Sequence, residues 1–336
     1  MKLVLLLVVF YSIVFGDKVI KIATYNVENL FDLQNKGYKY KEYEPNTKSN
    51  WNLKTYKTKL QNLSKVIKDV DADILALQEI HSLQALKDLR FTLKQKGLYY
   101  QYYKIADKKN TAIKVAFLSK YPFVYAKELQ VTSTYKYRNI LEAKFRIDSN
   151  DFYMFVNHWK AKSGPESMRV RSAKILRDRI SNIGYDKNII LLGDFNSDYE
   201  EYIKFKHKRK HNDTNSKTGI NHVLRTLKQT TKAKDVKYEK DNFYNLWYDA
   251  DANKRYSYIY KGKKESLDNI LISQSLLNKR GISYIYNSIA NLDKKYLFKK
   301  NKIYRWQLSR GRIQKHKGKG YSDHLPVMAK FRISTN

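Results

Sequence analysis

The chain of 336 residues contains no cysteine. This absence excludes disulfide bonds, a thiolate nucleophile and any zinc site with cysteine ligands. Proline is also scarce, with four residues, and no Pro-, Gly- or Ser-rich stretch marks a linker. No repeat with the spacing of solenoids or propellers occurs in the sequence either. A chain of this length without a visible boundary predicts one large domain, over residues 17–336.

Long apolar runs are confined to the first sixteen residues. Met1 and Lys2 give a positive start, residues 3–15 are almost wholly apolar, and Gly16 follows. This pattern predicts a signal peptide over residues 1–16 and hence an exported protein, either periplasmic or secreted. The run is short for an uncleaved anchor, and it lacks the turn residues expected around a buried first strand. No later stretch is apolar enough to predict a membrane span.

Acidic residues are scarce relative to basic residues. The sequence has 32 Asp and Glu against 66 Lys and Arg, which gives a net charge of +34. A protein with this charge attracts polyanions, whether nucleic acid, anionic lipid or acidic polysaccharide. Charge alone does not choose among these partners.

Short apolar runs predict strands at residues 19–26, 74–79, 114–119, 139–147, 152–158 and 189–192. Two further runs, 267–272 and 323–328, predict strands that begin with polar residues. Apolar residues at helical spacing predict one helix over 53–67 and another between Ser163 and Gly184. Fully apolar strands that alternate irregularly with helices predict two sheets packed face to face, each covered on its outer side by helices.

The apolar run at 189–192 stops at Gly193-Asp194-Phe195-Asn196. Because an unpaired buried carboxylate is costly, an acid in this position needs a partner. The ends of some strands and the starts of others share an edge in an antiparallel sheet. Taken singly, Asp194 and Asp323 could cap turns and His158 could be a core histidine. Taken together, eight polar residues are predicted to share one rim: Asn26, Glu79, His158, Asp194, Asn196, Asp268, Asp323 and His324.

The chemistry of this set favours a hydrolase. Oxygen ligands without cysteine favour a hard cation, Mg²⁺ first, with Mn²⁺ or Ca²⁺ as alternatives. Two histidines with carboxylate partners suit general acid and base catalysis near neutral pH. Phosphodiester hydrolysis needs a cation that offsets developing charge, a base for water and donors for the phosphate oxygens. The rim therefore predicts a metal-dependent phosphodiesterase.

Six segments resemble, in order, motifs of the endonuclease/exonuclease/phosphatase superfamily. They are Tyr-Asn-Val-Glu-Asn-Leu-Phe-Asp (25–32), Leu-Gln-Glu (77–79), Asn-His-Trp-Lys (157–160), Gly-Asp-Phe-Asn (193–196), Leu-Asp-Asn-Ile (267–270) and Ser-Asp-His-Leu-Pro (322–326). The chain resembles a deoxyribonuclease I-type protein over nearly all of its mature length, and is most similar to secreted bacterial nucleases. The resemblance implies a four-layer α/β/β/α sandwich, which agrees with the two covered sheets predicted above.

The resemblance also implies a metal side to the rim. Glu79 would ligate the metal with Asn26 beside it, and Asp323 would complete this side. Glu28 occupies a position where some members of the superfamily have an acid and others do not, so the resemblance gives it no firm role.

A catalytic side follows from the same resemblance. Asp194 and Asn196 would orient the attacking water or bind the scissile phosphate, and His324 would pair with Asp268. His158 would be the second catalytic imidazole, although the sequence shows no carboxylate partner for it. The other histidines lack such support and are expected at the surface: His81, His207, His211, His222 and His316.

Basic residues near these motifs are expected to contact phosphate or nucleic acid. Arg138 matches a position where the superfamily often has a phosphate-contacting arginine. A segment at 294–319 has eleven Lys and Arg, no acid and several aromatic residues. Cations neutralise phosphates and aromatic rings stack on bases. A second basic excursion, about 200–240, is more simply a solvated loop. The predicted contacts are Arg138, Lys160, Lys162, Arg305, Trp306, Arg310 and Arg312.

These observations predict an exported, monomeric phosphodiesterase acting on nucleic acid, with a DNA endonuclease of low sequence specificity as the leading hypothesis. Charge spread over a surface binds any polyphosphate backbone, DNA or RNA, without reading bases. One alternative is a secreted sphingomyelinase-type phosphodiesterase, because a fold does not settle the substrate. Another is a non-catalytic polyanion-binding protein. The Lys and Arg residues that interrupt 294–319 favour nucleic acid over a membrane surface.

Overall fold

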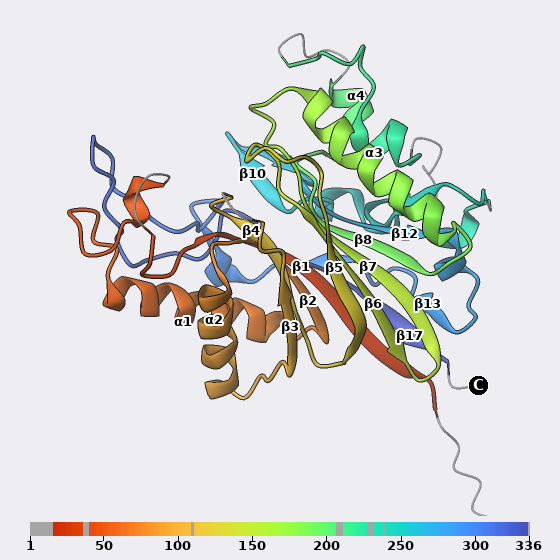
Figure 1. The fold of residues 1–336 in the computed structure, drawn as a ribbon, viewed down its shortest axis with the longest axis horizontal. Coiled ribbons are helices and arrows are strands. Elements are labelled where there is room, and N and C mark those ends of the chain that lie inside the picture. Colours follow the sequence, from red (N-terminus) through yellow and green to blue (C-terminus); the bar gives the residue numbers. More distant parts are fainter. Residues whose placement is uncertain are drawn as a thin grey trace, which may run out of the picture.

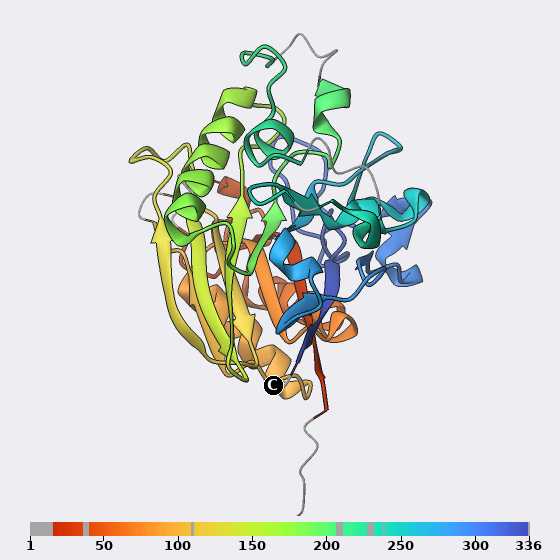
Figure 2. The same ribbon diagram turned by 90° about the vertical axis from the view of Figure 1, so that its right-hand side faces the viewer.

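The structure is a computed structural model that describes residues 16–35, 40–108, 111–205, 211–226, 232–237 and 239–334. Two large sheets pack face to face, and helices cover the outer face of each (Figure 1). The predicted four-layer α/β/β/α sandwich is confirmed, and Figure 2 shows its layers from the side. The predicted signal peptide lies, apart from Gly16, outside the described residues. Within those ranges, no helix is both long and apolar enough to cross a membrane.

The first sheet has seven strands, in the order β13-β17-β1-β2-β4-β3, and β14 also pairs with β17. Strands β1 and β2 are parallel, and every other neighbouring pair is antiparallel. The strands are β1 (Lys18–Leu30), β2 (Ile74–Ile80), β3 (Tyr102–Ile105), β4 (Lys114–Ser119), β13 (Ile282–Tyr284), β14 (Ala290–Asn291) and β17 (Val327–Ile333).

The second sheet has six strands, in the order β5-β6-β7-β8-β12-β9, with only β7 and β8 parallel. Two small hairpins, β10–β11 and β15–β16, stand apart from both sheets. The strands are β5 (Phe123–Leu129), β6 (Ile140–Ile147), β7 (Asn150–His158), β8 (Ile189–Asp194), β9 (Phe243–Asn245), β10 (Tyr258–Tyr260), β11 (Lys263–Glu265), β12 (Asp268–Ser273), β15 (Phe298–Lys299) and β16 (Lys302–Ile303).

Helices α1 (Leu53–Val70) and α2 (Leu83–Gln95) cover the first sheet, and α3 (Glu166–Ile183) covers the second (Figure 1). Asn52 and Ser82 cap the first two helices by accepting a hydrogen bond from a backbone N–H of the first turn. Helix α3 begins after Pro165 and ends at Ile183, directly before Gly184, as predicted. The short helices are α4 (Glu201–Phe205), η1 (Lys41–Tyr43), η2 (Gly219–Val223), η3 (Ala233–Asp235), η4 (Leu246–Asp249), η5 (Ala252–Lys254), η6 (Gln274–Leu277) and η7 (Lys295–Leu297).

The last strand starts later than the sequence predicts. β17 begins at Val327, so Asp323 and His324 lie in the loop that precedes it. Pro326 has no backbone N–H to donate to a neighbouring strand, which explains why regular pairing starts only after it. The two polar residues therefore reach the rim from a loop, in which His324 forms an isolated antiparallel bridge with Tyr258 of β10.

Candidate active site

The site lies where the core between the two sheets ends. Ile190 and Leu192 of β8 face this core, whereas Ile189 and Leu191 pack in the cluster beneath α3. Side chains of a strand alternate between its two faces, so Asp194 points toward the opposite sheet, like Leu192. The same alternation brings polar side chains to the end of the inter-sheet core on three more strands: Asn26 on β1, His158 on β7 and Asp268 on β12.

A close approach of β7 and β8 sets His158 beside Asp194. Gly193 has φ +132°, and a Cβ there would lie 2.1 Å from the carbonyl oxygen of Asn157. Only glycine therefore permits this pairing, in which His158 is the register partner of Asp194. His158 Nε2 lies 3.5 Å from Asp194 Oδ2 and 3.7 Å from Glu79 Oε1. These two carboxylates are the partners of His158 that the sequence did not reveal.

Asn26 joins the two sheets across this point. Its Nδ2 donates to Asp194 Oδ2 at 3.1 Å and to Glu79 Oε1 at 3.2 Å. Its Oδ1 accepts from the backbone N–H of Glu28 at 3.0 Å. The side chain of Asn26 thus links the predicted metal side to the predicted catalytic side. Its amide group helps to fix the orientation of the Glu79 and Asp194 carboxylates.

Bulges direct the carboxylates of Glu28 and Glu79. The register between β1 and β2 shifts between Asn26 and Leu30, and that between β2 and β4 shifts around Glu79. Both glutamates have left-handed backbones, with φ of 50° and 67°. For residues with a Cβ this conformation costs roughly 1–2 kcal/mol, which surrounding contacts must offset. A bulge changes the direction in which a side chain points, so it interrupts the regular alternation along a strand. The bulges therefore let Glu28 and Glu79 point to the rim, which regular alternation would not predict.

His324 and Asp268 form a buried pair. His324 Nδ1 lies 2.6 Å from Asp268 Oδ2, and the other ring nitrogen is 4.0 Å from Asp323 Oδ1. Burial by itself would lower the pKa of His324, but the charges of Asp268, Asp194 and Asp323 outweigh it and raise that pKa well above the usual value. The contact with Asp268 therefore favours the protonated form of His324, whose Nε2 lies on the side of Asp323.

Asp194 and His158 also have shifted pKa values, in opposite directions. Burial raises the pKa of Asp194 to about 7, with the charges of Asp268 and Glu79 adding to it and that of His324 opposing it. Burial and the charges of Arg138 and His324 hold the pKa of His158 well below its usual value. Burial thus favours the neutral form of His158, and the pKa of about 7 gives Asp194 a change of protonation state near neutral pH.

Two groups of side chains could hold a cation. Ligand atoms of Asp194, Asp268 and His324 lie within 4.8 Å of one another. Because His324 Nδ1 already bonds Asp268, this trio is better explained as an acid–base pair beside a carboxylate. Glu79 and Asp323, with Asn26, offer the oxygen ligands that Mg²⁺ prefers. Burial and the charge of Asp323 raise the pKa of Glu79, a crowding of carboxylates that a divalent cation would relieve.

Asn196 and Arg138 meet at one backbone carbonyl. Asn196 Nδ2 donates to the Trp159 carbonyl at 3.2 Å, and Arg138 Nη1 donates to the same oxygen at 3.1 Å. The Asn196 N–H also donates to Asp194 Oδ1 at 2.8 Å. Arg138 lies close enough for its charge to act on both Glu79 and His158. The structure therefore brings these two predicted residues to the rim.

The lysines that follow His158 are placed differently. Lys162 Nζ lies 2.9 Å from Glu201 Oε2 and 3.3 Å from Glu265 Oε1, so two carboxylates already neutralise it. Lys160 is half-buried, and its carbonyl accepts from the buried Arg169 at 3.0 Å. Lys162 is thus a poorer phosphate ligand than its position in the sequence indicates.

The basic segment 294–319 is packed against the protein at Trp306. The exposed fraction of Trp306 is 2%, and its ring meets Trp51 edge-on. Its Nε1 donates to His316 Nδ1 at 2.8 Å, and His316 Nε2 lies 2.8 Å from the Glu42 carbonyl. Trp306 therefore has no exposed face on which a base could stack. The expectation that His316 lies at the surface is wrong, because its ring joins this segment to η1.

His316 should make stability depend on pH. Burial lowers its pKa to about 4, against roughly 6.5 in an unfolded chain. The stability that it contributes is complete above about pH 6.5 and is lost as the pH falls toward 4, by up to roughly 3 kcal/mol. Denaturant unfolding between pH 7 and pH 4 should show wild type losing more free energy of unfolding than His316→Gln. Parallel curves for the two proteins would contradict this assignment.

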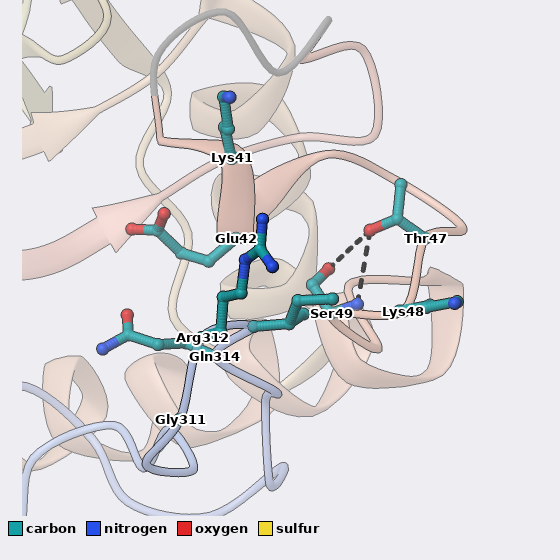
Figure 3. A pocket seen from close by; sticks show the side chains of 9 residues that line it. Lys41, Glu42, Thr47, Lys48, Ser49, Gly311, Arg312 and Gln314 are labelled. Carbon is teal, nitrogen blue, oxygen red and sulfur yellow. Dashed lines mark hydrogen bonds between the residues drawn. The ribbon is translucent and has the colours of Figure 1, made fainter.

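Beyond Trp306 the segment borders an open pocket of about 560 Å³. Figure 3 shows Lys41 and Glu42 of η1 on one side of it and Arg312 and Gln314 on the other. Lys48 adds a third basic side chain. Arg310 and Arg312 are both exposed, so these two predicted contacts remain accessible to a ligand.

The structure adds a cluster of charged side chains whose mutual contacts the sequence did not indicate. Arg305 donates from Nε to Glu28 Oε1 at 2.8 Å, and its Nη2 lies 3.1 Å from Asp323 Oδ2. Lys59, fully buried in α1, donates to the Glu28 carbonyl. One signal was present: Lys59 follows Tyr56 by three residues, so it falls within the apolar face of the predicted helix.

Comparison with known proteins is consistent with this geometry. A profile of the Endonuclease/Exonuclease/phosphatase family matches residues 21–333. The chain belongs to this family. Its name covers hydrolases of phosphate esters, which supports a phosphoesterase activity. No curated protein sequence matches the chain.

Solved structures share the fold at low sequence identity. A D. rerio TDP2 complexed with a single-strand DNA product has a TM-score of 0.58 and 13% identity, covering 94% of this chain and 99% of that one. A family member from Bacteroides thetaiotaomicron has a TM-score of 0.56 and 15% identity, covering 95% and 100%. A mannosyl-6-phosphatase from the same organism has a TM-score of 0.55 and 14% identity, covering 93% and 99%. At these identities the likeness establishes the fold alone.

Proposed function

We propose that the protein is an exported, metal-dependent phosphodiesterase that hydrolyses nucleic acid, with DNA as the main substrate. The observation that carries the proposal is the contact network in which Asn26 bridges Glu79 and Asp194, beside the Asp268–His324 pair. This network puts oxygen ligands, a carboxylate that titrates near neutral pH and an imidazolium at one point.

In this proposal Glu79, Asp323 and Asn26 would hold a divalent cation, which would offset the charge that develops on the phosphate. Asp194 accepts a proton from the attacking water, because its pKa of about 7 suits a general base near neutral pH. His324, held in its protonated form by Asp268, directs Nε2 at the phosphate and donates to an oxygen on which negative charge accumulates.

Nucleic acid is favoured as the substrate by charge. The net charge of +34 and the accessible Arg310 and Arg312 suit a polyphosphate backbone. The structurally similar TDP2 binds single-strand DNA product, which supports the same substrate class. Export is proposed from the apolar run at residues 3–15 alone. We propose a monomer, because low-specificity cleavage needs no symmetry match to the substrate.

A substrate panel tests the proposal. The mature protein, residues 17–336, is incubated with supercoiled plasmid, single-stranded DNA, RNA, sphingomyelin vesicles and a sugar phosphate. Each substrate is combined with Mg²⁺, Mn²⁺ or Ca²⁺, and EDTA serves as the control. We expect plasmid nicking that requires a divalent cation and stops in EDTA.

The other outcomes separate the alternatives. Release of phosphocholine without plasmid nicking would identify a sphingomyelinase. Cleavage of the sugar phosphate alone would indicate a phosphomonoesterase. DNA binding without cleavage of any substrate would leave a non-catalytic polyanion-binding protein.

A further inference from the structure

The carboxylate of Glu28 is fully engaged by the backbone and side chain of one short segment. Arg305 donates to Glu28 Oε1 from both Nε and Nη2, so this one oxygen accepts two charge-assisted hydrogen bonds. Glu28 Oε2 accepts the backbone N–H of Trp306 at 3.0 Å. Each oxygen of this acid therefore has a donor from the protein.

The same guanidinium reaches a second acid of the rim. Arg305 Nη2 lies 3.1 Å from Asp323 Oδ2. Glu28 and Asp323 come from strand β1 and from the loop before β17, far apart in sequence, and Arg305 bridges them. Carboxylates brought together in this way repel one another unless a cation lies between them. In this protein the cation between them is a side chain.

The backbone around Arg305 is held in place independently of these charges. Gly320 has φ +90°, and a Cβ there would lie 1.9 Å from the Arg305 carbonyl oxygen, so only glycine permits this contact. The Tyr321 N–H donates to the Tyr304 carbonyl at 2.9 Å, and Trp306 is anchored to His316. Arg305 is therefore positioned by its chain rather than folded inward from a free loop.

We propose that Arg305 is a resident cation that takes the place of a second divalent ion, so that the site binds one metal ion. Two-metal phosphoesterase sites share carboxylates between ions about 4 Å apart. Here Glu28 and one oxygen of Asp323 are committed to the guanidinium, which leaves Glu79, Asn26 and the other oxygen of Asp323 for an ion. The inference rests on the proposed metal-dependent function and specifies its ion requirement.

A resident guanidinium stays charged at every accessible pH, as a metal ion does, but a chelator cannot remove it. The side chain of Arg305 is 54% exposed, so it can also face a phosphate group of the substrate. EDTA-treated protein should therefore keep a positive group beside the phosphate position.

Metal stoichiometry tests the proposal without relying on catalysis. Isothermal titration of metal-free mature protein with Mn²⁺ should give one ion for wild type and two for R305A, because Glu28 and Asp323 are then free to bind. The double variant R305A/E28Q should return to one ion. R310A, which removes an exposed arginine of the same segment, is the matched control and should bind one ion. Thermal melting of each variant establishes that it is folded.

The result that would overturn the proposal is two ions bound by wild type, or one ion of unchanged affinity bound by R305A. DNA cleavage by the same preparations is a separate readout. A wild type that cleaves DNA with two bound ions would refute the resident cation and leave the proposed function intact. If wild type binds one ion and R305A binds two, but wild type cleaves no DNA, the resident cation would be supported and the proposed nuclease refuted.

Discussion

Asp194→Asn is expected to slow DNA cleavage by about 10³-fold while changing DNA affinity little. The substitution keeps the size of the side chain but removes the carboxylate that would accept a proton from water. The Asn196 N–H, which donates to Asp194 Oδ1, keeps its acceptor if the new amide oxygen takes that position. Asn26 Nδ2 then loses its bond to Oδ2 but keeps Glu79 Oε1 as an acceptor, so the rim should remain folded. Plasmid nicking measures the rate, and fluorescence anisotropy with a labelled duplex measures binding.

Asp186→Asn is the matched control, because it makes the same chemical change at an exposed acid that forms an ion pair with its neighbour Lys187. It should cleave DNA at the wild-type rate. If Asp194→Asn also cleaved at that rate, Asp194 would not be the base and the proposed chemistry would fail.

His324→Ala is expected to lower the cleavage rate by roughly 10²–10⁴-fold, because it removes the imidazolium that would stabilise charge on the phosphate. Asp268→Asn should produce much of the same loss, since the pKa of His324 is raised chiefly by the Asp268 carboxylate against the opposing effect of burial. The double variant should be little slower than His324→Ala, because residues that act as one unit are not additive. Cleavage rates of wild type, the two single variants and the double variant, measured from pH 5 to pH 9, test this expectation.

In Asp268→Asn, the pKa of His324 should fall toward its ordinary value. The imidazolium would then be lost at lower pH than in wild type, so the falling limb of the cleavage profile should move to lower pH. Multiplicative losses in the double variant, or an unmoved pH profile, would show that the two residues act independently.

Much of the fold follows from patterns that the sequence displays directly. The run Ile189 to Leu192 is apolar on both faces, because one face meets the other sheet and the opposite face meets the cluster beneath α3. The start of α3 after Pro165 and its end before Gly184 depend on backbone limits that two residue types impose locally. Such features need only neighbours in the chain, so they can be predicted from it.

The partners of individual side chains could not be predicted in this way. Trp306 is an aromatic residue in a basic segment, a sequence pattern that predicts base stacking. In the structure it is buried against Trp51 and His316. Lys162 follows His158 by four residues, yet Glu201 and Glu265 neutralise it from distant segments. Contacts between residues far apart in sequence depend on how whole elements pack, and no local pattern encodes them.

The sequence by itself determined which residue types lie at the strand ends, because strand alternation and the cost of a buried acid act over a few neighbouring residues. Only the tertiary structure decided what each of them contacts. It gave His158 its carboxylates, turned Glu28 and Glu79 at bulges, and carried Arg305 from the far end of the chain to Glu28. The reason is physical: charge pairing depends on distance in space, and the fold sets that distance.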